Sequence, residues 1–315
     1  AGIIAACLAI IKPHSKAISL VPGKRSHPSI GRGMRLAGAE QIQVNSSEEV
    51  SQVIGTGEVS FMMITGVSSE LEVIDKKIML DAIALAQKAG VPVMLDDAYG
   101  TRLRPIIYDQ PMTMQTGVNL AVTACDKAGM NGPRAGLMVG EKQYMDLVNT
   151  KAAELGLEAR SPLAAAVWSS LKDFTPRELI NEVEFGALIY ECLAKKYGPA
   201  KVVKSGIGAS FTAENIYELV KEIRGDGVDL PVCPGEITAA IGMYWLKQYG
   251  IISVSALGQP GASIWLRFKP EPKVVSRMGG LEALVEAIDD GIQHVAGHAH
   301  SIETMKALIL GSRAV

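Results

Sequence analysis

Short apolar segments that alternate with helical segments run through the first 140 residues, and this alternation constrains the fold more than any other feature. Residues 70–89 place apolar side chains at helical spacing, and Gly90 and Pro92 end that helix. The alternation predicts an α/β fold with a mostly parallel sheet covered by helices on both faces. The strand candidates are residues 17–21, 60–65, 91–95, 118–123 and 136–139.

The second half of the chain is richer in helical patterns and ends in a smaller α/β unit. We expect a large sheet domain over residues 1–195 and a small C-terminal α/β domain over residues 196–315, because 315 residues suffice for two domains. The expected helices are 162–171, 176–196, 213–223 and 234–250, and the expected strands include 250–256 and 262–268.

Charge and cysteine content narrow the class of protein. Lysine and arginine number 31 against 33 acidic residues, a net charge of −2 that argues against a dedicated nucleic-acid surface. The four cysteines are scattered without metal-ligand spacing, which fits a reducing cytoplasm. The apolar run at 1–11 is too short to span a membrane and lacks the basic flank of a signal peptide. We expect it to form a buried helix, with a further segment preceding Ala1.

Two charged residues follow strand candidates, at positions where α/β sheets bind ligands. Asp96 follows residues 91–95 and Lys127 follows residues 118–123, so we expect both to face one cleft. We also expect Lys127 to be buried among small residues, where a neutral amine can attack a carbonyl. A Schiff-base lysine and an aspartate for the pyridinium nitrogen are what pyridoxal phosphate needs. Alternatively, Lys127 is a solvated turn lysine and Asp96 caps the turn at 97–100.

Several stretches of the chain resemble fold-type-I pyridoxal phosphate enzymes. They are most similar to the bacterial selenocysteine synthase (L-seryl-tRNA(Sec) selenium transferase) family, and closest to its shorter archaeal relatives of uncertain function. The resemblance implies an aspartate aminotransferase-like fold and pyridoxal 5′-phosphate as the cofactor. The stretches are SHPSI (26–30), GMRLAGAE (33–40), VPVMLDDAYG (91–100), CDKAGMNGPRAGLMVG (125–140) and PGEITAAIGMYWLKQYGIISVSALGQPGASIWLRF (234–268).

The resemblance also implies roles for single residues. Lys127 would form the internal aldimine, and Asp96 would pair with the pyridine nitrogen. Ala98 would pack against the cofactor ring, and His27 lies where a ring-stacking side chain is common. The alternative for His27 is a loop histidine that precedes Pro28.

Substrate and phosphate contacts are implied less directly. Arg267 corresponds to an arginine that binds a substrate carboxylate, a task that suits a guanidinium; the alternative is a solvent-facing strand arginine. Relatives carry a hydroxyl residue three positions before the lysine, where this chain has Ala124, so Thr123 is the candidate substitute. The phosphate-binding turn of the resembled enzymes would precede or coincide with Ala1.

The resemblance implies a transferase or lyase that acts on an amino-acid-type substrate by β-elimination or β-replacement. Aldol cleavage and transamination stay open, as does a non-catalytic scaffold, against which the pair Lys127 and Asp96 argues. Selenium transfer on seryl-tRNA is disfavoured, because the bacterial enzyme uses an additional N-terminal region for tRNA. We expect a homodimer or an assembly of dimers, with the loop at 129–136 close to the subunit contact. Arg134 in this loop is also a substrate-binding candidate.

Weaker signals lie elsewhere in the chain. His294 and His298 are four residues apart with His300 nearby, a spacing that suits a solvated helix face better than a metal site. Cys125 is interpreted as a small buried side chain rather than a reactive thiolate. The basic residues of 23–25, with Arg32 and Arg35, form a cluster beside His27 that either meets an anionic substrate group or is solvated.

Overall fold

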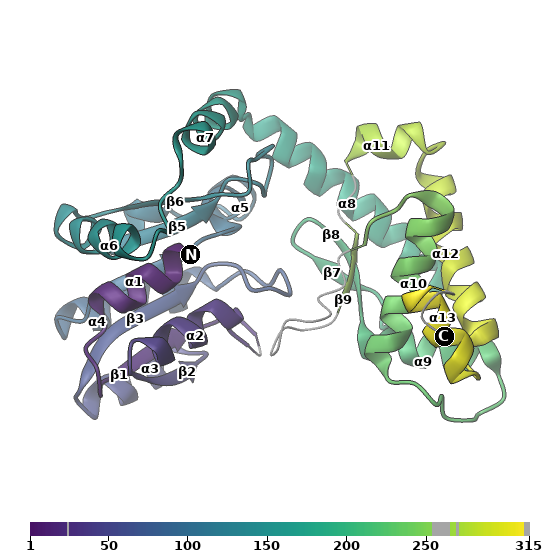
Figure 1. The fold of residues 1–315 in the computed structure, drawn as a ribbon, viewed down its shortest axis with the longest axis horizontal. Helices are drawn as coiled ribbons and strands as arrows, with labels where there is room; N and C mark the ends of the chain where they lie inside the picture. The colour runs from purple at the N-terminus through teal and green to yellow at the C-terminus, as the bar shows by residue number, and fades with distance from the viewer. Residues whose placement is uncertain (24, 254–264, 269–270, 312–315) are drawn as a thin grey trace. The chain divides into compact units, whose positions relative to one another are not determined.

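A computed structural model describes residues 1–23, 25–253, 265–268 and 271–311 (Figure 1). The chain divides into two compact units, residues 1–180 and residues 181–315. The division falls within α8 (Pro176–Tyr197), the same helix that contains the boundary predicted at residue 195. That boundary stays a prediction, and each unit is described by itself.

The first unit is built on a six-stranded sheet with the order β2-β1-β3-β4-β5-β6. The first five strands in this order, from β2 through β1 to β5, are parallel to one another. Strand β6 runs antiparallel to β5 at the edge. This confirms the predicted mostly parallel sheet. The strands are β1 (Lys16–Leu20), β2 (Glu40–Val44), β3 (Val59–Thr65), β4 (Val93–Asp96), β5 (Leu120–Ala124) and β6 (Gly136–Gly140).

Helices cover both faces of this sheet (Figure 1). On one face Met63 and Met94 belong to a core shared with α1 (Gly2–Ile10), α2 (Pro28–Leu36) and α6 (Lys142–Glu154). On the other face Ile64 and Leu95 pack with α3 (Ser47–Gly55) and α4 (Lys76–Lys88). Adjacent residues of one strand serve opposite cores, because successive side chains of a strand alternate between faces. The remaining elements of this unit are α5 (Gly100–Ile107), the 3₁₀ helix η1 (Thr113–Thr116) and α7 (Ser161–Asp173).

Helix α4 is shorter than the sequence predicts. Asp75 caps it, with Oδ1 accepting hydrogen bonds from the backbone N–H groups of Lys77 at 2.8 Å and Ile78 at 3.0 Å. The predicted start at residue 70 is wrong, because this carboxylate satisfies the free amides of a helix that begins at Lys76. Gly90 has φ 68° and follows the last turn, as predicted for the residue that ends the helix.

The second unit contains an antiparallel sheet with the order β7-β8-β9 and several helices. Its core includes Phe211, Trp245 and Phe268. Residues 250–253 are not a strand, and the rest of the strand predicted at 250–256 lies outside the described residues, as do residues 262–264 of the last one. The elements are β7 (Val203–Ser205), β8 (Gly208–Thr212), α9 (Ala213–Arg224), α10 (Pro234–Tyr249), β9 (Trp265–Phe268), α11 (Pro272–Arg277), α12 (Leu281–His298) and α13 (Ile302–Leu310).

In the part of the chain that the structure describes, no helix combines the length and the apolar character that a membrane crossing requires. All four cysteines are free thiols. The cytoplasmic location expected from these cysteines stays a prediction.

Candidate active site

Strand β4 ends with a buried carboxylate, Asp96, which is 6% exposed. It lies opposite Thr65 of β3 and Val122 of β5 in the sheet register. Its Oδ1 accepts a hydrogen bond from the backbone N–H of Ala98 at 3.3 Å. The pKa of Asp96 is raised to about 6, mainly by burial and to a smaller extent by the Asp97 charge. The Ala98 N–H and the Lys127 charge lower it. Asp96 is therefore a carboxylate whose charge is costly without a positive partner.

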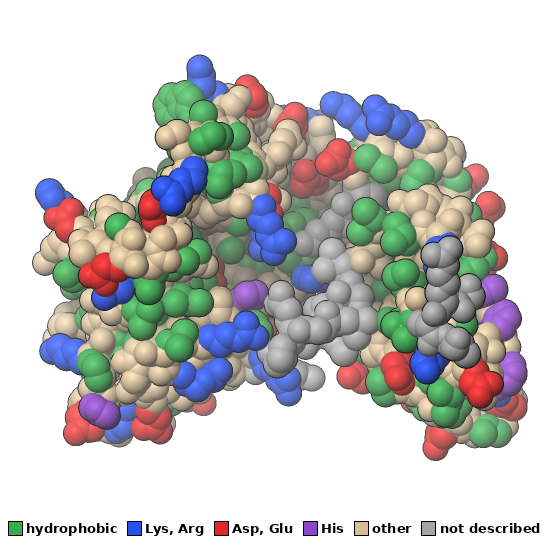
Figure 2. Space-filling view, viewed as in Figure 1, with side chains coloured by type: hydrophobic (Ala, Val, Ile, Leu, Met, Phe, Trp, Pro, Cys, Tyr) green, Lys and Arg blue, Asp and Glu red, His purple; other side chains and the backbone are tan. Residues whose placement is uncertain are grey.

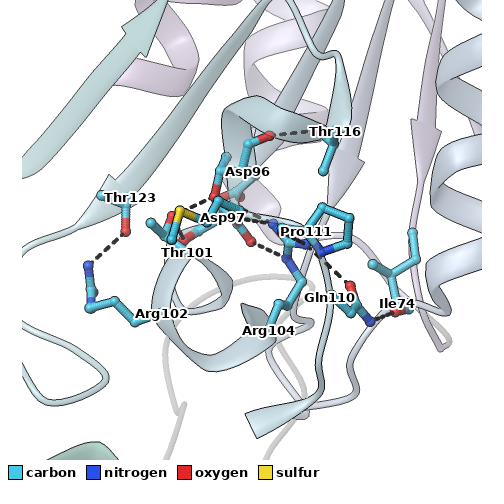
Figure 3. Close-up of polar contacts among 12 residues, drawn as sticks. Ile74, Asp96, Asp97, Thr101, Arg102, Arg104, Gln110, Pro111, Thr116 and Thr123 are labelled. Carbon is cyan, nitrogen blue, oxygen red and sulfur yellow. Dashed lines mark hydrogen bonds and ion pairs between the residues drawn. The ribbon is translucent and has the colours of Figure 1, made fainter. Parts of the chain in front are cut away.

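The adjacent carboxylate, Asp97, has a different partner. It forms an ion pair with Arg104 of α5, and both side chains are 0% exposed. The Thr113 hydroxyl donates to Asp97 Oδ2 at 2.6 Å. Arg104 Nη1 donates to Gln110 Oε1 at 3.2 Å (Figure 3). These bonds tie the end of β4 to α5 and η1, so Asp97 is a structural residue beside Asp96.

Two glycines make room for the Asp97–Arg104 pair. A Cβ atom on Gly66 would lie 2.2 Å from Asp97 Oδ1, and one on Gly100 would lie 2.0 Å from the same oxygen. Any side chain at either position would displace the carboxylate. The DDAYG turn therefore needs its glycine for close packing against the buried ion pair.

Lys127 is exposed and lies in a turn, as in the alternative of a solvated turn lysine, so the predicted burial of this lysine is wrong. It begins a tight turn in which its carbonyl oxygen accepts from Met130 N at 3.3 Å, and Ala128 and Gly129 have φ 51° and 78°. Positive φ at both central positions is the type I′ pattern, which favours glycine or asparagine. Ala128 accepts it at a cost of about 1–2 kcal/mol. In this turn the residues Ala128 and Met130 are buried, while the Lys127 side chain is exposed.

Arg102 is the residue of this region that the sequence did not predict. It is 7% exposed and lies on α5. Its Nη2 donates to the carbonyl oxygens of Ala124 and Lys127, each at 2.8 Å, and its Nε donates to the Ala128 carbonyl at 3.1 Å. The sequence signal that could have identified Arg102 is the pair of arginines, Arg102 and Arg104, a few residues after two consecutive aspartates.

Asp96 and Lys127 lie at the same edge of the sheet, because β4 ends at Asp96 and Lys127 is three residues past the end of the neighbouring strand β5. The Lys127 ammonium lowers the pKa of the Asp96 carboxyl. It also lowers the pKa of His27, after the larger effect of withdrawal from water and together with Arg32. The three residues are therefore candidates for one site at the carboxyl edge of the sheet.

His27 forms the N-cap of α2. Its Nδ1 accepts from the backbone N–H of Ser29 at 3.3 Å and lies 2.7 Å from the Ser29 hydroxyl. An accepting Nδ1 carries no proton, so the neutral ring holds its proton on Nε2. The lowered pKa of His27 and the positive end of the helix dipole both favour this neutral form.

The loop that carries His27 is attached to the edge strand β2. Three polar side chains at alternate positions of this strand and just beyond it make the attachment. Asn45 Nδ2 donates to the Val21 carbonyl at 2.9 Å, Gln43 Oε1 accepts from Ser26 N at 3.0 Å, and Gln41 Nε2 donates to Ser26 Oγ at 3.2 Å. These hydrogen bonds define the direction in which α2 begins.

The other candidates of the first unit flank the lysine turn. The Thr123 hydroxyl lies 3.4 Å from Arg102 Nη1, which donates to it. Ala98 is half-buried, and Arg134 is exposed. Cys125 is buried, and burial raises the pKa of its thiol, which fits the predicted small buried side chain. The roles of Thr123, Ala98 and Arg134 stay predictions.

Arg267 belongs to the second unit, on β9. Along this strand Leu266 and Phe268 are buried, while Trp265 and Arg267 are partly exposed. Buried and partly exposed side chains therefore alternate along β9. Arg267 lines a cavity of about 280 Å³ together with Phe268 and Met278. Its predicted role toward a substrate carboxylate stays a prediction.

His294 and His298 lie on α12. The His294 ring stacks on Tyr244 with 4.2 Å between centroids, and His298 lies 4.4 Å from His294. Asp290 accepts from the Tyr244 hydroxyl at 2.7 Å. Among the described residues no group of three ligating side chains is arranged for a metal ion.

The side chains of Asp96 and Lys127, at the carboxyl edge of the sheet, fit pyridoxal phosphate. An ionised carboxyl group has about four acceptor sites, and the hydrogen bond from Ala98 occupies one of those on Asp96. A pyridinium N–H would use another and supply the positive charge that a buried carboxylate requires. The exposed Lys127 amine lies within electrostatic reach of Asp96, where an aldehyde could meet it.

The fold is the one defined by fold-type-I pyridoxal phosphate enzymes of the aspartate aminotransferase type. The solved N-succinyldiaminopimelate aminotransferase of Mycobacterium tuberculosis matches with a TM-score of 0.63 and 13% identity. The match covers 94% of this chain and 74% of that structure. No protein-family model matches the chain.

The chain belongs to the UPF0425 pyridoxal phosphate-dependent protein family. It is 34% identical over 310 residues to the member from Methanothermobacter thermautotrophicus, covering 98% of this chain and 78% of that relative. The L-seryl-tRNA(Sec) selenium transferase of Actinobacillus pleuropneumoniae is 23% identical over 146 residues, covering 44% of this chain and 32% of that enzyme. The resemblance seen in the sequence is confirmed, with higher identity to the archaeal relative than to the bacterial enzyme.

Proposed function

We propose that this chain is a pyridoxal phosphate-dependent enzyme that acts on an amino acid or an amino-acid-derived substrate. The observation that carries the proposal is the position of Asp96 and Lys127 at the carboxyl ends of two neighbouring strands, β4 and β5. One is a buried carboxylate with unused acceptor sites, the other is an exposed amine, and the charge of Lys127 acts on Asp96. The names of the family members, which describe pyridoxal phosphate-dependent proteins, support the same cofactor.

Each residue has a separate task in this proposal. When bound, pyridoxal phosphate supplies an electron sink for a substrate carbanion. The Lys127 amine would hold the cofactor aldehyde covalently and would move a proton at the substrate Cα. Asp96 holds a proton at the ring nitrogen, because an ionised carboxylate stabilises the pyridinium. Ala98 and the neutral His27 ring would hold the cofactor ring in place.

We propose β-elimination or β-replacement as the reaction, of the kind catalysed by a selenocysteine-synthase-like lyase or transferase. The partial match to a selenium transferase supports this choice. Aldol cleavage, transamination and a non-catalytic scaffold are the alternatives that the experiment below separates. Selenium transfer on seryl-tRNA itself is a further alternative, and its test requires aminoacylated tRNA as the substrate. We propose a small-molecule substrate, because a chain of net charge −2 offers little electrostatic attraction to tRNA.

We also propose that the protein is a homodimer or an assembly of dimers. Helix α7 exposes large apolar side chains, among them Leu163 at 41%, Trp168 at 65% and Leu171 at 38%. Figure 2 shows hydrophobic side chains gathered over this helix. Apolar surfaces of this kind are typical of subunit contacts. Sedimentation at micromolar concentration should show dimers; monomers alone would contradict this part of the proposal.

Isotope exchange at the substrate Cα tests the catalytic proposal. Protein loaded with pyridoxal phosphate is incubated in D₂O with single amino acids, and loss of the Cα proton is followed by NMR. We expect exchange for at least one amino acid, with β-substituted ones also releasing their β-substituent, and no exchange for Lys127→Ala. Keto-acid product without release of ammonia or of the β-substituent indicates transamination, whereas keto acid together with ammonia and the released β-substituent indicates β-elimination. Aldehyde product indicates aldol cleavage. Absence of exchange and product across the screen contradicts the enzyme proposal.

A further inference from the structure

We propose that Arg102 is a positioning residue for Lys127: its guanidinium holds the turn at 127–130 so that the lysine amine is directed to the cofactor site. The inference rests on the proposed function for the role of Lys127. The hydrogen bonds that support it do not depend on the cofactor.

The Arg102 guanidinium donates hydrogen bonds to three backbone carbonyl oxygens in and before the turn. Nη2 lies 2.8 Å from the Ala124 carbonyl oxygen, at the end of β5, and 2.8 Å from that of Lys127. Nε lies 3.1 Å from the carbonyl oxygen of Ala128. Arg102 therefore joins the last strand residue before the turn to the first two residues of the turn itself.

The turn needs such a support, because its conformation is unfavourable for its sequence. Ala128 has φ 51°, a region that residues with a Cβ atom rarely adopt. The Met130 N–H that closes the turn is 3.3 Å from the Lys127 oxygen, whereas the Arg102 bond to the same oxygen is 2.8 Å. A charged donor makes the stronger bond. Arg102 thus contributes more to the order of this turn than the turn's own hydrogen bond.

Apolar groups hold the other side of the turn. A Cβ atom on Gly129 would lie 3.1 Å from the Phe174 ring and 3.4 Å from Leu179 Cβ. The Phe174 ring also lies 5.9 Å from the Arg102 guanidinium carbon, within the range of a cation–π contact. The turn is enclosed between Arg102 and these side chains, which leaves the Lys127 side chain as its exposed part.

A lysine at position 102 cannot reproduce this arrangement. Guanidinium nitrogens form a rigid planar fork, while an ammonium is a single point at the end of a flexible chain. Arg102→Lys therefore keeps the positive charge but loses the simultaneous bonds to Ala124, Lys127 and Ala128. The variant separates positioning from simple charge.

The experiment measures hydrogen exchange of the amides in residues 125–130 in cofactor-free Arg102→Lys and in the unmodified chain. Loss of charge-assisted bonds should raise exchange in this segment about tenfold to a hundredfold. The pKa of His27, measured by NMR, reports the position of the Lys127 charge and should rise in the variant as the amine moves away. After addition of pyridoxal phosphate and borohydride, the reduced adduct should form on Lys127 about tenfold more slowly.

Two further variants control the experiment. Met79→Ala removes a buried side chain of α4 on the opposite face of the sheet, so it should lower stability without raising exchange selectively at 125–130. Ala128→Gly in the Arg102→Lys background removes the cost of positive φ and should restore part of the protection. A merely structural role for Arg102 predicts no such rescue.

The outcomes separate the two claims. Unchanged exchange at 125–130, or an increase spread equally over the first unit as in Met79→Ala, overturns the positioning role of Arg102. If the unmodified chain gives no adduct on Lys127, the proposed function fails, while exchange and the His27 pKa still decide whether Arg102 places Lys127. A local rise in exchange, a rise in the His27 pKa and rescue by Ala128→Gly support the inference.

Discussion

Asp97 and Arg104 form a fully buried ion pair directly beneath the candidate site, with the Thr113 hydroxyl donating to the same carboxylate. Asp96, next to Asp97, ends β4 at the candidate site, and Arg102, two positions before Arg104, bonds to the turn that carries Lys127. The DDAYGTRLR stretch thus contains both the buried ion pair and two residues, Asp96 and Arg102, that lie at the candidate site or bond to its lysine turn.

Asp97→Ala should strongly destabilise the first unit. The change leaves the Arg104 guanidinium buried without its counter-ion, a situation that costs about 3–5 kcal/mol. Urea unfolding measures the loss. Asp81→Ala, which removes an exposed partner of Lys77, is the matched control and should leave the unfolding free energy nearly unchanged. Equal effects of the two substitutions would show that the buried pair has no special importance.

Gly100→Ala should also be destabilising, because its Cβ would lie 2.0 Å from Asp97 Oδ1. Forcing this contact should cost about 1–3 kcal/mol in unfolding free energy. Gly55→Ala is the control: no atom lies within 4 Å of its added Cβ, at the end of α3. That substitution should stabilise the protein by up to about 1 kcal/mol. Thermal unfolding of both variants checks the sign, and a neutral Gly100→Ala would contradict the packing described here.

Asp96→Asn should stabilise the cofactor-free protein above pH 6 but not at pH 4. The folded pKa of about 6 exceeds the ordinary value of 3.8, so the folded state binds more protons than the unfolded state between these values. Stability therefore falls as pH rises from about 4 to 6, and the ionised group costs on the order of 3 kcal/mol above that range. Asparagine removes this dependence. Urea unfolding of both proteins at pH 4 and pH 8 should show the difference, and a pH-independent difference would refute the assigned burial.

Lys127→Met should raise the pKa of His27. The ammonium disfavours the imidazolium, so its removal moves the histidine toward its ordinary value of 6.5. An NMR titration of the His27 ring measures the change without any cofactor. Lys142→Met, which removes an exposed lysine paired with Asp146 on α6, is the control. A His27 titration that is the same in both variants would place Lys127 away from His27.

The sheet could be predicted because its inner strands are short runs of apolar residues that end at polar ones. Strand β4 is an example: three apolar residues precede Asp96. Strand β2 was missed, because as an edge strand it carries Gln41 and Gln43, which bind the loop before α2 rather than a core. Helix α3 was missed although its capping residues, Ser46 and Glu49, form a recognisable pair.

The site could be predicted only in part. The positions of Asp96 and Lys127 follow from strand ends, which meet at one edge of a parallel sheet. The exposure of Lys127 depends on the positive φ of Ala128, and alanine gives no sequence signal for that conformation. Arg102 bonds to backbone carbonyl oxygens, which every residue has. The pattern of side chains in the sequence therefore does not reveal its role.

Peptide mapping after borohydride treatment tests the central claim most directly. The full chain is incubated with pyridoxal phosphate, reduced and digested, and the modified lysine is identified by mass spectrometry. The account predicts one reduced adduct, on the peptide containing Lys127, and loss of the visible absorbance on reduction. Lys127→Ala should yield none, while Lys142→Ala should react as the unmodified chain does. A reduced adduct on another lysine, or on none, would contradict the assignment of Lys127 as the cofactor-binding residue.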